Sequence, residues 1–147
     1  MKDIIIIGAG PGGIFAAYEL MQRRPDLKVA VFEAGHALNK RRCPIDGEKI
    51  TSCVGCKSCA IMSGFGGAGA FSDGKLSLSY EVGGDLPQLI GADLAQETID
   101  YTDKIYLEFG ADTHIEGIEN SEEVKKIRKK AIAAGLKLVD CPIRHLG

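Results

Sequence analysis

Residues 4–13 read Ile4-Ile5-Ile6-Ile7-Gly8-Ala9-Gly10-Pro11-Gly12-Gly13, an apolar run that passes directly into a glycine-rich turn. A second apolar run, Val29 to Phe32, ends twenty residues after Gly13 in an acid, Glu33. Short apolar runs suit buried strands, and the residues between the two runs have the apolar spacing of a helix. The sequence therefore predicts a strand, a helix over residues 11–23 and a second strand, in the order of a βαβ unit.

The glycine spacing in this turn matches the GxGxxG pattern of dinucleotide-binding turns. Gly8 would allow the sharp reversal, Gly10 would let the backbone approach a pyrophosphate, and Gly13 would let the helix lie close to its strand. Free amides at the helix start attract phosphate. Glu33 would accept hydrogen bonds from both ribose hydroxyls, and its charge argues against the 2′-phosphate of NADP. The predicted site for the adenosine half of a dinucleotide comprises Gly8, Gly10, Pro11, Gly12, Gly13, Glu33 and the adjoining Ala34.

Composition limits the class of protein. The chain has 147 residues, 45% hydrophobic content and a net charge of −2, which suits a soluble α/β protein and gives no reason to expect nucleic acid as a partner. The basic run Lys125 to Lys130 is interpreted as the solvated face of a helix that begins at Ser121 and ends near Gly135. No apolar run is long enough for a membrane span or a signal peptide, so a cytoplasmic location is expected.

The later sequence predicts an unfinished Rossmann-like FAD/NAD(P)-binding fold of the α/β class. Only two strong strands precede the irregular residues 34–84, whereas each half of such a sheet normally has three. A helix is predicted over residues 87–109 and a strand over residues 136–140. We expect residues 1–84 to be the N-terminal part of a cofactor domain, and residues 85–147 to begin a second, substrate domain. The chain is thus interpreted as the N-terminal piece of a longer enzyme, inactive alone and of open oligomeric state.

Three further motifs lie in the irregular part of the chain: Arg42-Cys43-Pro44, the CxxCxxC run from Cys53 to Cys59, and the sequence GFGGAGAFSDGKL at residues 64–76. Residues 1–35 resemble the FAD-binding N-terminus of two-dinucleotide-fold flavoproteins. The added motifs, with the closing sequence CPIRHLG, resemble a group of bacterial FAD-dependent dehydrogenases of mostly unassigned substrate. Ala34 departs from the broad pattern, which often has a basic residue there. The resemblance implies an FAD-dependent oxidoreductase with a small-molecule substrate or electron acceptor, and NAD(P) as a candidate co-substrate.

The glycine-dense segment can also leave amides open to a planar or anionic ligand. We expect Gly66, Gly67 and Ser72 to lie near FAD, as such segments do in related flavoproteins. The cations that could meet phosphate charge are Arg41, Arg42 and Lys75. The alternative for each residue is a flexible loop without ligand contact.

Four cysteines, Cys43, Cys53, Cys56 and Cys59, admit several chemistries. They could ligate an iron–sulfur cluster, although the ferredoxin order places the Cys-Pro cysteine last. They could hold zinc, although two CxxC steps that share a cysteine differ from separated knuckles. Cys53 and Cys56 could form a redox-active dithiol. The remaining interpretation is four reduced thiols without a ligand.

Redox chemistry on bound FAD is the leading hypothesis, because the flavin itself would carry the reaction. The alternatives are an NAD-dependent dehydrogenase domain and a non-catalytic module that senses a nucleotide or a metal. The histidines His36, His114 and His145 have no spacing typical of a catalytic triad, so the catalytic residue stays unassigned.

Overall fold

The computed structural model describes residues 1–119 and 121–146. The chain divides into two compact units, residues 1–72 and residues 73–147. This division precedes the boundary expected between residues 84 and 85. The assignment of a cofactor domain and a substrate domain stays a prediction.

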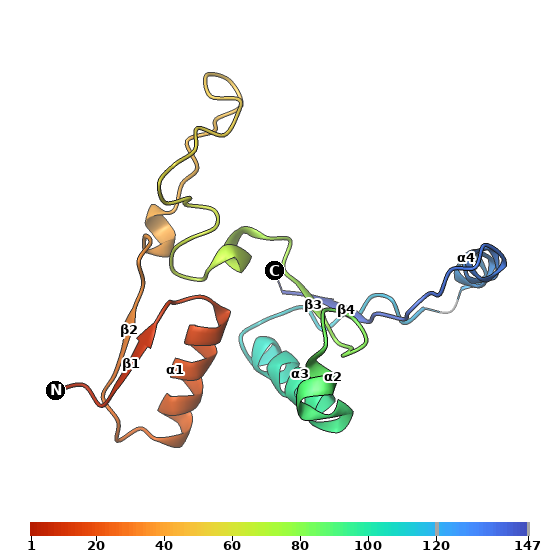
Figure 1. The fold of residues 1–147 in the computed structure, drawn as a ribbon, viewed down its shortest axis with the longest axis horizontal. Helices are drawn as coiled ribbons and strands as arrows, with labels where there is room; N and C mark the ends of the chain where they lie inside the picture. Colours follow the sequence, from red (N-terminus) through yellow and green to blue (C-terminus); the bar gives the residue numbers. More distant parts are fainter. Residues whose placement is uncertain (120, 147) are drawn as a thin grey trace. The chain divides into compact units, whose positions relative to one another are not determined.

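The first unit begins with a βαβ arrangement (Figure 1). Strand β1 (Ile4–Ile7) and strand β2 (Val29–Phe32) run parallel, in a register that pairs Ile4 with Val29 and Ile7 with Phe32. Helix α1 (Pro11–Arg23) connects them and packs against both strands. The predicted helix has the observed bounds because local signals set them: Pro11 suits the first helical turn, where its missing N–H costs nothing.

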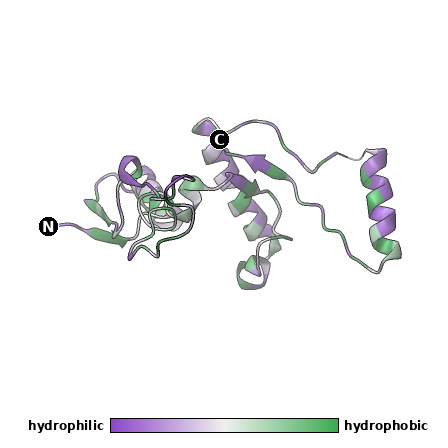
Figure 2. Cartoon of the chain, turned by 90° about the horizontal axis from the view of Figure 1, so that it is seen from above, coloured by the Kyte–Doolittle hydropathy of each residue, from purple (hydrophilic) through white to green (hydrophobic). Residues whose placement is uncertain are grey.

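The β1–β2 sheet has two strands and an apolar surface that the described residues leave largely open. Ile5, Ile7 and Phe32 are 60%, 89% and 60% exposed, although parallel strands are normally buried on both faces. Figure 2 shows these strands in the green of hydrophobic residues. The fold is thus mixed α/β, but each of its sheets has two strands, fewer than the predicted fold class requires.

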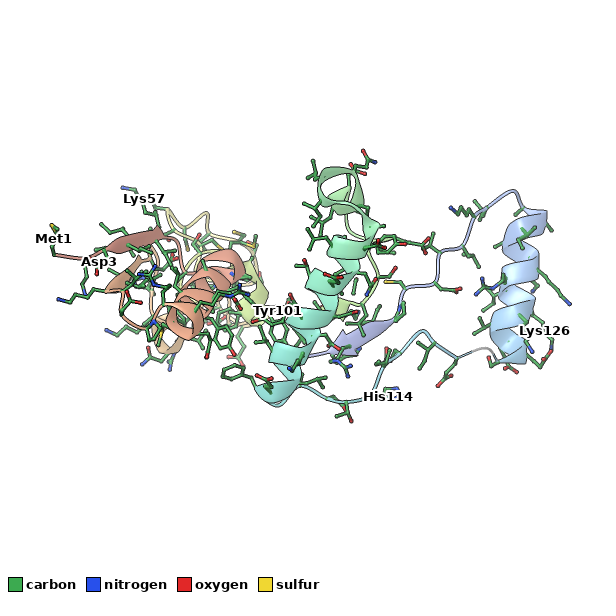
Figure 3. All side chains as sticks on the ribbon, turned by 90° about the horizontal axis from the view of Figure 1, so that it is seen from below. Met1, Asp3, Lys57, Tyr101, His114 and Lys126 are labelled. Atoms are coloured by element: carbon green, nitrogen blue, oxygen red, sulfur yellow. The ribbon has the colours of Figure 1, made fainter. Side chains whose placement is uncertain are left out.

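A long irregular loop follows β2 and carries most of the cysteines. It runs between two short 3₁₀ helices, η1 (Leu38–Lys40) and η2 (Ala68–Phe71). Its middle part extends away from α1 and the sheet (Figure 1), and Lys57 lies exposed on it (Figure 3). The return of the loop, just before η2, lies against the turn between β1 and α1, where Gly66 N donates a 2.8 Å hydrogen bond to Ala9 O.

The second unit contains the remaining elements. They are β3 (Lys75–Ser77), α2 (Leu86–Ile90), α3 (Ala92–Glu108), α4 (Glu122–Ala133) and β4 (Ile143–His145). The single helix predicted over residues 87–109 is therefore wrong in one respect. Gly91 divides it into α2 and α3 with a φ of 85°, a conformation that helices do not contain.

The strand predicted over residues 136–140 is also wrong, because the strand forms later, at β4. It pairs antiparallel with β3, Lys75 lying opposite His145. Arg144 supports this placement: its buried side chain pairs with both carboxylate oxygens of Asp103 on α3 and donates a 2.7 Å hydrogen bond to Asp112 O. A buried cation requires such partners, and they come from distant parts of the sequence.

Helix α4 confirms the interpretation of the basic run. Ser121 is the N-cap, and its hydroxyl oxygen accepts a 3.3 Å hydrogen bond from Val124 N. Lys125, Lys126 and Lys129 are exposed, and Figure 3 shows Lys126 on this helix. Within the described ranges, no helix combines the length and the apolar character needed to cross a membrane.

Candidate nucleotide site

The turn between β1 and α1 is tight because two glycines permit it. Gly8 has a φ of 97°, which L side chains rarely adopt. A Cβ added at Gly13 would lie 2.0 Å from Gly8 O and 3.3 Å from the Ile6 side chain. The helix therefore lies as close to its strand as the sequence analysis expected of these glycines.

The first turn of α1 presents backbone rather than side chains. Gly10 is the N-cap, and no side chain caps the helix there. Pro11 occupies the first helical position, and a Cβ added at Gly12 would meet no atom within 4 Å. The positive end of a 13-residue helix, with amide groups that lack helical partners, is thereby open to an anion.

Glu33 lies at this turn and is bound to it. Its Oε2 accepts a 2.7 Å hydrogen bond from Ala9 N, and its Oε1 accepts one of 2.8 Å from Gly35 N. These two N–H groups lower the pKa of Glu33, and the Arg41 guanidinium adds to the effect. A carboxylate has about four acceptor positions. The bonds from Ala9 N and Gly35 N leave acceptor capacity on this carboxylate, and its ribose role stays a prediction.

A second glycine segment lies against the turn. We call residues Gly64 to Gly67 the glycine strap. Gly66 N donates a 2.8 Å hydrogen bond to Ala9 O. A Cβ added at Gly67 would lie 3.1 Å from both Gly10 Cα and Pro11 Cδ. The structure thus brings two predicted site residues, Gly66 and Gly67, beside the β1–α1 turn, from a position more than fifty residues later in the chain.

Arg41 has a different place from the one expected. It is 4% exposed, and its guanidinium donates hydrogen bonds to the carbonyl oxygens of four loop residues. The oxygens and distances are Ala60 O 2.8 Å, Ile61 O 2.6 Å, Phe65 O 2.8 Å and Gly67 O 2.7 Å. The guanidinium therefore binds the loop backbone. With four of its N–H groups used in this way, it cannot also form a two-pronged contact with a phosphate.

The remaining predicted residues are less closely placed. Ala34 and Arg42 are exposed. The Ser72 hydroxyl donates a 3.1 Å hydrogen bond to Gly69 O at the end of η2. Lys75 belongs to the second unit, where it forms a 2.7 Å ion pair with Asp73. The roles of these residues toward a cofactor stay predictions.

Sequence reasoning assigned no role in the site to Ala9 and Gly35, and it named Gly64 only as a member of the glycine-dense segment. Ala9 is 1% exposed and joins both Glu33 and the glycine strap through its backbone. Gly35 and Gly64 allow the strap to pass close to the chain that follows β2, because a Cβ at Gly35 would lie 2.6 Å from Gly64 Cα. Backbone contacts of this kind leave only one signal in the sequence, the excess of glycine itself.

The four cysteines named as candidate ligands are exposed along the loop. Within residues 1–119 and 121–146, no three histidine, cysteine or acidic side chains gather as ligands for a metal ion. The cluster, zinc, dithiol and free-thiol interpretations of Cys43, Cys53, Cys56 and Cys59 therefore stay open.

Cys59 is the cysteine whose environment favours the thiolate. The N–H groups of Met62 and Ile61 lower its pKa, and the charge of Arg41 contributes in the same direction. Because the thiolate is the nucleophile, alkylation of Cys59 should reach half its maximal rate at a lower pH than alkylation of glutathione in the same tube. Peptide-resolved mass spectrometry after iodoacetamide pulses measures this profile. A profile at or above that of glutathione would contradict the structure, whereas Arg41→Met should move the profile upward.

The comparisons with known proteins concern the same stretch of chain. The Thi4 family matches residues 1–39. The thiamine thiazole synthases of Phaeosphaeria nodorum and Yarrowia lipolytica are each 60% identical to this chain over 36 residues, which is 24% of this chain and 11% of each relative. The enzyme of the same name from Schizosaccharomyces pombe is 57% identical over 36 residues, with the same coverage of both chains. No solved structure matches significantly.

The matched stretch contains the β1–α1–β2 unit and Glu33. Similarity to enzymes over this stretch supports a dinucleotide-binding unit at the N-terminus. The relatives come from eukaryotes, so they do not support the narrower bacterial dehydrogenase group. The matches span about one tenth of the length of these relatives and do not include the cysteine motif.

Proposed function

We propose that the chain binds the adenosine diphosphate half of a dinucleotide, with FAD as the leading ligand, through the β1–α1 turn of a Rossmann-like fold. One observation carries the proposal. The N-terminus of α1, the Glu33 carboxylate and the glycine strap meet at a single turn, and the strap lies so close to the turn that a Cβ added at Gly67 would be 3.1 Å from Gly10 Cα. Amides and a helix dipole suit a pyrophosphate, and a carboxylate suits a ribose.

The proposed parent activity is that of an enzyme that uses this dinucleotide on a small-molecule substrate or electron acceptor. FAD, when bound, would supply hydride or electron transfer. The chain's own contribution is to hold the adenosine diphosphate half. The backbone N–H groups at Gly10 to Gly13 would donate hydrogen bonds to the phosphate oxygens, and the Glu33 carboxylate would accept hydrogen bonds from the ribose hydroxyls. Repulsion between Glu33 and a 2′-phosphate favours FAD or NAD over NADP at this turn.

Ligand identification on the full-length protein tests the proposal. We expect mass spectrometry of the ligand released by denaturation to detect an adenine dinucleotide, and ADP to compete with FAD in a fluorescence titration. NAD should bind at least about tenfold more tightly than NADP, since one added repulsive contact of about 1.4 kcal/mol produces that ratio. A protein that binds none of FAD, NAD and ADP contradicts the proposal. Binding of NAD but not FAD would favour the NAD-dependent alternative.

A second candidate activity, that of a thiamine thiazole synthase, is favoured by the identity of up to 62% over the matched N-terminal stretch. Complementation separates the two candidates. The full-length protein is expressed in a microbial strain that lacks its own thiamine thiazole synthase, and growth is scored without thiamine. Growth supports this second activity, whereas its absence alongside retained FAD supports the oxidoreductase.

A further inference from the structure

The glycine strap is held in place by one buried cation. Arg41 follows η1, and its guanidinium uses four of its five N–H groups on loop carbonyls. Its Cζ also lies 4.7 Å from the centre of the Phe71 ring, a cation–π distance. Two of the hydrogen bonds reach the strap itself, at Phe65 O and Gly67 O. The position of the strap therefore depends on this side chain.

The glycine strap lies beside the N-terminus of α1. Phe65 N donates a 3.0 Å hydrogen bond to His36 O, and Gly66 N donates one to Ala9 O. These bonds, with the Arg41 contacts, place Gly67 against Gly10 and Pro11, at the start of α1. Loss of Arg41 would remove the guanidinium donor from four carbonyl oxygens. The glycine strap would then no longer be held against the turn by these bonds.

The buried charge of Arg41 is not paired with a nearby carboxylate. Among the described residues, no carboxylate lies within ion-pair distance of it, although Glu33 and Cys59 feel its field. A buried charge is costly unless it is paired or hydrogen-bonded, and an anionic ligand at the neighbouring turn would gain from it.

We propose that Arg41 is a positioning residue for the dinucleotide, which holds the glycine strap against the β1–α1 turn and adds positive charge beside the pyrophosphate. This inference rests on the proposed function and assigns a role to a residue that contacts only protein. It predicts a selective effect: removal of Arg41 should weaken ligands with a pyrophosphate and spare adenosine, which lacks phosphate.

The test compares three variants of the full-length protein by titration with FAD, ADP and adenosine. Arg41→Met and Arg41→Lys should each weaken FAD and ADP at least about tenfold, the loss of one charge-assisted hydrogen bond. Lysine should not restore binding, because one ammonium cannot reach four oxygens arranged around a planar fork. Lys40→Met, which removes an exposed charge from the preceding residue, should remain within about twofold. Adenosine should change by less than about threefold in every variant.

A second pair of variants covers the case in which Arg41→Met does not fold. Gly67→Ala adds a Cβ 3.1 Å from Gly10 Cα at a residue with a φ of 65°, without removing the buried charge. Gly69→Ala is the matched control, since its Cβ meets no atom within 4 Å. Gly67→Ala should weaken ADP at least about tenfold and Gly69→Ala by less than about twofold.

The outcomes separate the two proposals. If the unmodified protein binds none of the three ligands, the proposed function itself fails. If it binds FAD and ADP but folded Arg41 and Gly67 variants bind them equally well, or lose adenosine to the same extent, the role of Arg41 is overturned and the nucleotide site stands.

Discussion

Gly13→Ala is expected to weaken nucleotide binding strongly and to destabilise the first unit. The added Cβ would lie 2.0 Å from Gly8 O, a backbone atom that cannot move without opening the turn. Overpacking of this kind costs about 3 kcal/mol, and displacement of α1 also moves the amides offered to phosphate. We expect the affinity for FAD to fall at least about a hundredfold, the equivalent of about 2.8 kcal/mol. Fluorescence titration and thermal unfolding of the ligand-free protein measure both effects.

Gly12→Ala is the matched control for this prediction, because its Cβ would meet no atom within 4 Å and its backbone is helical. Alanine in a helix is favoured over glycine by about 0.5 to 1 kcal/mol, so the ligand-free Gly12→Ala protein should unfold at the same or a slightly higher temperature. Equal unfolding temperatures for the Gly12→Ala and Gly13→Ala proteins would show that α1 does not pack on its strand as described.

Glu33→Gln should give the second large effect, at least about a tenfold loss of affinity for FAD and NAD. The amide keeps one acceptor oxygen but directs an NH₂ group toward either Ala9 N or Gly35 N, both of which are donors. The same change removes the charge that repels a 2′-phosphate. The ratio of NAD to NADP affinity should therefore fall toward one, and an unchanged ratio would contradict the ribose role.

The pH dependence of the Glu33 contribution follows from its lowered pKa. A carboxyl whose pKa is lower in the folded state contributes stability above its ordinary pKa, about 4.3, and loses it as the pH falls through the lowered value. Ligand-free stability of the unmodified protein should thus decline below about pH 4. Glu33→Gln should decline less over that range, because its amide does not titrate. Chemical denaturation at several pH values provides the measurement.

Local signals explain what the sequence could predict. The bounds of α1 follow from Pro11 at its start and from apolar residues at helical spacing, and the close approach at Gly13 follows from the glycine pattern. The serine cap marks the start of α4 as expected, and the lysines of its basic run are exposed. Each of these features depends on residues within about one helix of one another.

Features that depend on contacts between residues far apart in the sequence could not be predicted. Arg41 was expected to meet phosphate, but it binds carbonyl oxygens 19 to 26 residues away, and nothing in the side chains of those residues indicates this. Glu33 was expected to face a ribose, yet it also binds the amide of Ala9, 24 residues earlier. The strand at β4 depends on a pairing of Arg144 with Asp103 across 41 residues. Secondary-structure propensity and the spacing of apolar residues do not indicate such partners.

The Arg41 contacts have a consequence for how freely the cysteine-rich loop can vary. The guanidinium recognises main-chain oxygens, so it makes no demand on the side chains at residues 60, 61 and 65. A library that randomises these three positions should retain many folded members. The side chains of the loop can therefore change while the Arg41 hydrogen bonds that hold its backbone stay the same. A salt bridge between two side chains would not allow this, because it fixes the identity of both residues.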